Sequence, residues 1–213
     1  MIVKTLTVGP FQENCYLVGD GVTRDAVLVD PGDEPVRLIA AVEQGGWTLR
    51  ALWITHGHID HVGGIAAVKR QWNVPVYLHP LDRPLYDRAA EQGAHFGLRI
   101  EPPPPPEHEL AEGDVLTVGN LSFAVIHVPG HAPGHVAFVG HGVVFGGDCL
   151  FAGSIGRTDL PLSDRRALAH SLERFAALAG DTVVYSGHGP ETTIRDEKRS
   201  NPFLTGAARL IAT

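Results

Sequence analysis

The chain has 213 residues, of which 44% are apolar and 19% are charged. This favours one large globular domain and excludes a disulfide-stapled miniprotein, a long repeat array or a mainly disordered chain. Seventeen basic and 24 acidic side chains give a formal net charge of −7, and no Lys/Arg cluster stands out, so nucleic-acid binding through phosphate neutralisation is disfavoured. Neither a signal peptide nor an apolar run long enough for a membrane helix is recognised, so the default expectation is a cytoplasmic protein without a membrane partner.

The first half of the sequence predicts strands followed by alternating helices and strands. Three β-rich runs, separated by Gly-Pro and Gly-Asp-Gly turns, predict an antiparallel meander. A run of five prolines at 102–106 can only be extended, and we interpret it as a rigid connector. The predicted strands span residues 2–8, 15–18, 26–29, 51–54 and 75–78, and the predicted helices span residues 34–43, 62–72 and 84–92.

The second half repeats the β-rich opening, with predicted strands at residues 115–118, 121–128, 135–139, 143–145 and 182–186. A helix is predicted at 163–178 with Ser163 as its N-cap, and a last helical segment closes the chain. We therefore expect a single domain, 1–213, of two similar halves (about 1–100 and 107–213). The predicted class is α/β, a four-layer sandwich in which two mixed β-sheets face each other and helices cover the outside.

The segment THGHIDH, residues 55–61, crowds four potential metal ligands onto a glycine-containing turn between a predicted strand and a helix. These ligands are His56, His58, Asp60 and His61. Imidazole and carboxylate groups suit zinc, iron or manganese. The alternative interpretation is a polar helix cap with solvated histidines, but chance seldom produces this spacing in a chain of this composition.

One ion does not comfortably use four ligands from one turn, because a catalytic zinc takes three protein ligands and keeps a position open. We therefore expect two metals, or further ligands from elsewhere in the chain. Three candidates each lie beside glycine near the end of a predicted strand: His131, Asp148 and His188. Glycine allows the backbone to bend sharply close to an ion.

The motifs THGHIDH, PGHAPGH, GGDCLF and SGHGP, in this order, resemble those of the metallo-β-lactamase-fold hydrolases, most closely the glyoxalase II (hydroxyacylglutathione hydrolase) branch. The segments QENCYLV, LVDPG, GSIGRTDLP and NPF are similar to those of short bacterial glyoxalase II-like proteins, so the resemblance covers nearly the whole chain. It implies the αβ/βα sandwich named above. It further implies one metal held by His56, His58 and His131, a second held by Asp60, His61 and His188, and Asp148 bridging both.

By the same resemblance, Asp60 and Asp148 are the catalytic candidates and Arg157 contacts a carboxylate of the substrate. A structural ion pair of Arg157 with Asp159 is the alternative. The implied cofactors are two divalent ions, zinc first, with iron or manganese as alternatives. Such a pair makes hydroxide available at neutral pH and polarises a carbonyl, and a bridging hydroxide is the expected nucleophile. Two divalent ions together with these ligands carry a net positive charge, which suits a small anionic substrate.

A thioester fits this chemistry because its thiol, with a pKa of about 8.5, leaves readily as the thiolate. The predicted function is therefore metal-dependent thioester hydrolysis of glyoxalase II type, with the oligomeric state left open. The main alternative is a persulfide dioxygenase with one iron, which the GRTD segment also resembles. A metallo-hydrolase of another ester or lactone and a non-catalytic metal-binding protein are further alternatives, whereas a β-lactamase or an RNA-processing nuclease is disfavoured.

Three neighbouring residues carry weaker expectations. Asp30 either fixes the tautomer of a ligand histidine or caps the turn with Pro31 and Gly32. His135 either supports a metal ligand from behind or is a hydrogen-bonded strand histidine, and we expect the second. Cys149, beside Asp148, is expected to be packed away in an apolar setting rather than to be a further ligand. Cys15 and Cys149 are expected to be free thiols.

Overall fold

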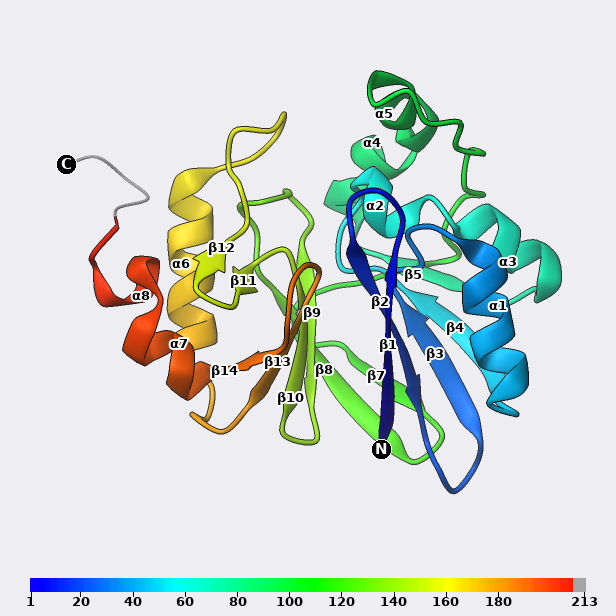
Figure 1. The fold of residues 1–213 in the computed structure, drawn as a ribbon, viewed down its shortest axis with the longest axis horizontal. Coiled ribbons are helices and arrows are strands. Elements are labelled where there is room, and N and C mark those ends of the chain that lie inside the picture. Colours follow the sequence, from blue (N-terminus) through cyan, green and yellow to red (C-terminus); the bar gives the residue numbers. More distant parts are fainter. Residues whose placement is uncertain (209–213) are drawn as a thin grey trace.

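Two six-stranded β-sheets face each other at the centre of the molecule, and helices cover both outer faces (Figure 1). The computed structural model describes residues 1–208. The helices α1 and α3 lie on the outer face of the first sheet, and α6 and α7 lie on that of the second. The predicted four-layer α/β sandwich is therefore confirmed.

The first sheet has the order β1-β2-β3-β4-β5-β6. Its first two pairings are antiparallel, which confirms the predicted meander, and the remaining three are parallel. The proline run leads into β6, which pairs with β5 in this sheet. The strands are β1 (Ile2–Val8), β2 (Glu13–Gly19), β3 (Asp25–Val29), β4 (Thr48–Trp53), β5 (Val76–Leu78) and β6 (His108–Glu109).

The second sheet has the order β14-β13-β10-β9-β8-β7, and only its β10–β13 pair is parallel. A separate hairpin, β11–β12, follows β10. The strands are β7 (Val115–Val118), β8 (Leu121–His127), β9 (Val136–Gly140), β10 (Val143–Gly147), β11 (Leu150–Phe151), β12 (Ser154–Ile155), β13 (Val183–Ser186) and β14 (Thr192–Thr193). That the two halves are duplicates stays a prediction.

The helices are mostly short. They are α1 (Pro35–Gln44), α2 (Ile59–Val62), α3 (Ile65–Gln71), the 3₁₀ turn η1 (Pro80–Asp82), α4 (Arg83–Tyr86), α5 (Ala89–His95), α6 (Arg165–Ala176), α7 (Ile194–Ser200) and α8 (Pro202–Thr205).

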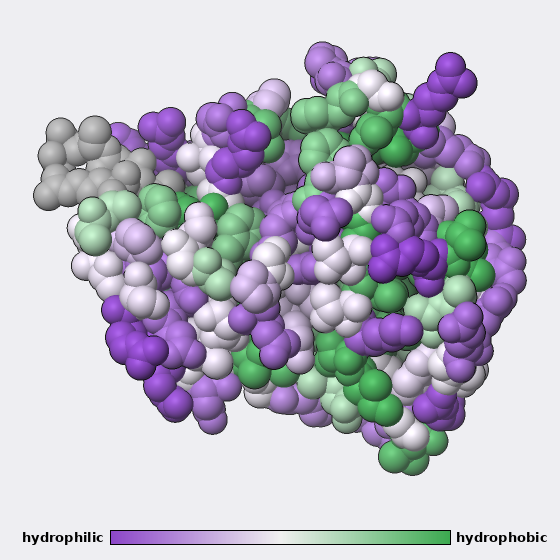
Figure 2. Space-filling view, viewed as in Figure 1, coloured by the Kyte–Doolittle hydropathy of each residue, from purple (hydrophilic) through white to green (hydrophobic). Residues whose placement is uncertain are grey.

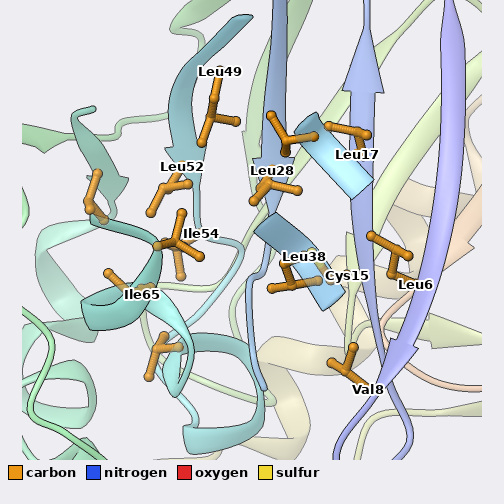
Figure 3. Close-up of a cluster of buried hydrophobic side chains, with 14 of the residues drawn as sticks. Leu6, Val8, Cys15, Leu17, Leu28, Leu38, Leu49, Leu52, Ile54 and Ile65 are labelled. Atoms are coloured by element: carbon orange, nitrogen blue, oxygen red, sulfur yellow. The ribbon is translucent and has the colours of Figure 1, made fainter. Parts of the chain in front are cut away.

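Three clusters of buried apolar side chains lie between the four layers. The first packs α1 and α3 onto the first sheet (Figure 3), the second lies between the two sheets, and the third packs α6 and α7 onto the second sheet. Neighbouring residues on a strand point to opposite faces. Accordingly, Leu52 belongs to the first cluster and Trp53 to the second, while Val144 belongs to the third and Phe145 to the second.

Local details differ from the sequence predictions. The helix predicted at 62–72 is interrupted, because Gly64 donates its N–H to the Pro31 carbonyl (2.9 Å), and a Cβ on Gly64 would lie only 2.7 Å from that oxygen. The helix predicted at 84–92 is likewise divided into α4 and α5. Asp164, not Ser163, caps α6, since its carboxylate accepts two backbone N–H bonds of the first turn.

Candidate metal centre

The seven predicted metal ligands come together at one end of the sandwich. His56 and its three neighbours in THGHIDH follow the carboxyl end of β4, and Asp60 and His61 lie in the short helix α2. The other three come from the second sheet, where His131, Asp148 and His188 follow the carboxyl ends of β8, β10 and β13. The two sheets thus supply the two sides of one cluster.

One group of the cluster consists of three buried histidines, His56, His58 and His131, whose ligand atoms lie within 4.8 Å of one another. The His58 Nδ1 and His131 Nε2 atoms are 2.8 Å apart. The His56 ring stands edge-on to both other rings. Three imidazoles arranged in this way match the donor set of a divalent transition metal.

A second group consists of Asp60, His61 and His188, with the His188 Nε2 3.2 Å from the Asp60 Oδ2. Asp148 lies between the two groups. Its Oδ2 is 3.6 Å from the His131 Nε2 and 3.4 Å from the His188 Nε2, and its Oδ1 is 3.4 Å from the His61 Nε2. One carboxylate therefore contacts both groups.

Asp30 orients two of the histidines from behind. Its Oδ2 lies 3.0 Å from the His61 Nδ1 and also accepts the Thr55 hydroxyl (2.6 Å). Because the single hydroxyl proton of Thr55 goes to Asp30, its oxygen accepts from the His56 Nδ1 (3.0 Å). The Nε2 lone pairs of His56 and His61 then face the cluster. Of the two expectations for Asp30, the structure shows the contact with a histidine.

His131 is oriented by the backbone of the loop that contains Arg157. Its Nδ1 donates to the Arg157 carbonyl (2.8 Å), so its Nε2, which faces the His58 Nδ1, carries the lone pair. The Arg157 guanidinium is exposed and makes two bonds to Asp159, of 2.7 and 2.8 Å. The side chain predicted to bind substrate is thus paired with a neighbour, whereas its carbonyl supports the cluster.

Buried atoms without partners test whether the cluster fits metal ions. Within residues 1–208, the His56 Nε2, the His61 Nε2 and the Asp148 Oδ1 are buried and have no hydrogen-bond partner. Burying such atoms unpaired is costly unless something else binds them. All three belong to the predicted ligand set and lie inside the cluster, so the residues present fit two divalent ions.

The two groups differ in their electrostatics. Burial lowers the pKa of His56 and of His58, to about 3 for His58, so both rings are neutral and have lone pairs available at pH 7. Although burial opposes it, hydrogen bonding to the Asp148 and Asp60 carboxylates raises the pKa of His188 to about 9. The carboxylates beside the second group therefore favour a positive charge at this position, whether on a protonated histidine or on a bound cation.

Two expectations for nearby residues have different outcomes. His135 is fully buried against the His56 ring, with centroids 4.7 Å apart, and within residues 1–208 neither ring nitrogen has a hydrogen-bond partner. The expectation of a hydrogen-bonded strand histidine is thus wrong, because His135 precedes β9 and packs into the cluster. Cys149 is fully buried in the third apolar cluster, and Cys15 and Cys149 are free thiols, as expected.

Sequence reasoning missed two buried carboxylates. Both carboxylate oxygens of Glu13 lack a partner among the described residues, and Oε1 lies 3.9 Å from the His61 Nδ1. The signal was a charged residue opening a strand of buried residues, since every position of β2 is buried. Asp82 lies between the strand predicted at 75–78 and the helix predicted at 84–92, where no role is predicted, and it is fully buried.

The start of β2 holds the His188 loop in place. The Asn14 side chain donates to the Ser186 carbonyl (3.1 Å) and to the Gly189 carbonyl (2.8 Å), and the Tyr16 hydroxyl also donates to Ser186 (2.6 Å). The Asn14 N–H bonds the carbonyl of Gly187. The first sheet thereby fixes a ligand that belongs to the second.

An apolar pocket adjoins Asp60. Its lining includes Val8, Phe11, Ile59 and Ile100. Figure 2 shows hydrophobic side chains gathered near this end of the molecule, close to α5.

Within residues 1–208, no helix combines the length and apolar character that a membrane crossing requires.

Comparisons with known proteins agree with this geometry. Residues 8–188 match the family described as the Metallo-beta-lactamase superfamily. The chain is 40% identical to "Hydroxyacylglutathione hydrolase GloC" of Haemophilus influenzae, a match that covers 96% of this chain and 98% of that protein.

Two solved structures are similar to this chain in both fold and sequence. The di-iron-bound form of TTHA1623 has a TM-score of 0.89 and 48% identity, covering 95% of this chain and 100% of that one. BLEG-1, described as a B3 metallo-beta-lactamase, has a TM-score of 0.91 and 38% identity, covering 96% of this chain and 100% of that one.

Proposed function

Because this chain belongs to the metallo-β-lactamase superfamily, we propose that it is a metal-dependent hydrolase that cleaves small anionic thioesters, as glyoxalase II enzymes do. The observation that carries the proposal is the position of Asp148, whose two oxygens contact histidines of both groups. His56, His58 and His131 would hold one ion and Asp60, His61 and His188 the other. The 40% identity to a hydroxyacylglutathione hydrolase supports the thioester over other esters.

When bound, two divalent ions would supply a hydroxide nucleophile at neutral pH and polarise the carbonyl of the substrate. The chain's own residues prepare the site for this chemistry. Asp30, Thr55 and the Arg157 carbonyl hold three imidazoles with Nε2 facing the cluster. Asp60 and Asp148 would supply the negative charge needed to hold two cations close to each other. The leaving thiolate needs no general acid because of its low pKa, so no further proton donor is required.

The first prediction is that the purified protein contains between one and two equivalents of metal and hydrolyses S-lactoylglutathione without an added redox cofactor. The donor set suits zinc, iron and manganese, and a relative is described in a di-iron-bound form, so elemental analysis should measure all three. Thiol release is followed before and after removal of metal by a chelator. Restoration of activity by added metal is the expected result.

Two substrates separate this proposal from its alternatives. Oxygen consumption with glutathione persulfide, without thioester cleavage, would establish the dioxygenase with one iron. Cleavage of a β-lactam in preference to the thioester would instead assign the activity of the 38%-identical B3 enzyme. Either outcome contradicts thioester hydrolysis as the main activity.

A second prediction concerns Arg157, for which we propose a contact with a carboxylate of the substrate. If the guanidinium binds substrate and transition state equally, Arg157→Ala raises KM and leaves kcat nearly unchanged. The value of kcat/KM should fall about 10- to 150-fold for an anionic thioester, the loss of one charge-assisted bond. A neutral thioester serves as the control. An equal loss with both substrates would assign Arg157 to holding its loop through Asp159.

A further inference from the structure

Asp82 is a fully buried carboxylate that belongs to neither group of predicted ligands. Its Oδ2 accepts the N–H of Gly57 (2.7 Å), and its Oδ1 accepts the N–H of Gly134. Gly57 lies between His56 and His58, and Gly134 lies three residues after His131. One carboxylate therefore binds the backbones of two ligand loops, one from each sheet.

Both loops are pressed closely against the segment that contains Asp82. A Cβ on Gly57 would lie 2.8 Å from the Asp82 carbonyl oxygen, and a Cβ on Gly134 would lie 2.7 Å from the Asp82 nitrogen and 2.9 Å from its Oδ1. Real Cβ atoms hardly ever come so close, so only glycine fits at these two positions. The close contact between Asp82 and the two loops therefore depends on these glycines as well as on the carboxylate.

The relative position of the two loops decides the shape of the first group. The His58 Nδ1 and the His131 Nε2, only 2.8 Å apart, come from different sides of this contact. A second hydrogen bond, from the Val136 N–H to the Thr55 carbonyl (2.9 Å), also links the segments that carry the two loops, but it lies nearer the strands. Loss of Asp82 should therefore shift the loops without separating the sheets.

We propose that Asp82 is a positioning residue that sets the separation of His56 and His58 from His131, and thereby the affinity and geometry of the first metal position. The inference rests on the proposed metal centre, but not on its substrate. Burial makes a carboxylate costly here, since it raises the pKa of Asp82 to about 6 despite the two N–H donors. Within residues 1–208, the carboxylate bonds to the two loops that carry predicted ligands and to no other group, which fits a role at the centre that these loops form.

The test replaces the carboxylate by its near-isosteric amide. In Asp82→Asn one side-chain oxygen becomes an N–H donor that faces a backbone N–H, so one of the two loops loses its acceptor. The apoprotein is titrated with Co²⁺, with visible absorption as the readout of coordination and a chelator in competition to give the affinity. We expect the first position to bind 10- to 100-fold more weakly, the usual effect of losing a partner behind the ligands, and its absorption bands to shift.

Reference variants identify the two positions and exclude trivial causes. His131→Ala gives the spectrum without the first position, and His188→Ala gives it without the second. Asp87→Asn is the matched control, because Asp87 lies five residues further on and its carboxylate makes an exposed pair with Arg83. It should bind both ions as the unaltered protein does. Circular dichroism of each apoprotein confirms that it is folded.

Each result decides between the possibilities. Unchanged affinity and spectrum in folded Asp82→Asn would overturn the proposal, and so would equal weakening of both positions. If this variant does not fold, Gly134→Ala carries the same expectation, since its methyl group displaces the loop from Asp82 while keeping the carboxylate. Normal binding there would also overturn the proposal. Failure of the unaltered protein to cleave thioesters, with both ions bound, would instead contradict only the proposed substrate.

Discussion

Replacement of Asp148 by alanine is expected to remove bound metal from both positions and to lower thioester hydrolysis at least about a thousandfold. The Asp148 carboxylate contacts His131, His61 and His188, so its removal takes a shared anion from both groups at once. Loss of a single group that stabilises the transition-state charge already costs 10²- to 10³-fold in rate. Elemental analysis of the variant, together with steady-state kinetics, measures both effects.

The matched control is Asp181→Ala, which removes an exposed aspartate elsewhere on the chain. It should retain full metal content and full activity. If Asp148→Ala keeps two equivalents of metal, Asp148 does not bridge the two positions. If it keeps one, its carboxylate belongs to one group only, and the proposed centre has to be divided differently.

The second large effect is expected for Asp30→Asn, which changes the tautomer of a ligand without removing it. The Asp30 Oδ2 fixes the proton of His61 on Nδ1. An amide N–H at that place would donate to Nδ1, so the proton would move to Nε2, the atom that faces the cluster. We expect a loss of activity of roughly 10²- to 10⁴-fold, because a wrong tautomer and a lost partner behind a ligand each have effects in this range.

The backbone at Asp30 should tolerate the change. Asp30 has a φ of +51°, a left-handed conformation that asparagine adopts readily. Asp25→Asn, at the start of the strand that Asp30 follows, is the control, because the Asp25 carboxylate pairs with the exposed Arg50. The proton positions of His61 can be followed by ¹⁵N NMR of the imidazole rings. Unchanged tautomer populations, together with unchanged activity, would show that Asp30 serves only the turn.

Most of the fold could be predicted because its long strands carry strong local patterns. The run from Ile2 to Val8 is a strand with the same bounds in the structure, and the antiparallel meander that it begins follows from turns that Gly and Pro mark in the sequence. The pattern failed where packing between distant segments overrides local preference. The contact of Gly64 with Pro31, for example, interrupts a helix whose apolar spacing continues through the break.

The candidate centre shows the same division. Its seven predicted ligands could be found because a motif or a flanking glycine marks each of them, and the structure brings all seven side chains together. Glu13 and Asp82 were missed, since neither is flanked by another potential ligand or by glycine in the sequence. Their burial depends on which segments meet in space, and single-sequence patterns contain no record of that.

The bonds from Asn14 and Tyr16 to Ser186 have a consequence for how the protein is made. They join residues 172 and 170 positions apart, so the second half of the centre cannot assemble until nearly the whole chain has left the ribosome. Contacts of such sequence separation also slow folding, because a long loop must close before they form. The three histidines of the THGHIDH turn are synthesised much earlier. A nascent chain therefore exposes these potential metal ligands well before the rest of the candidate centre can form.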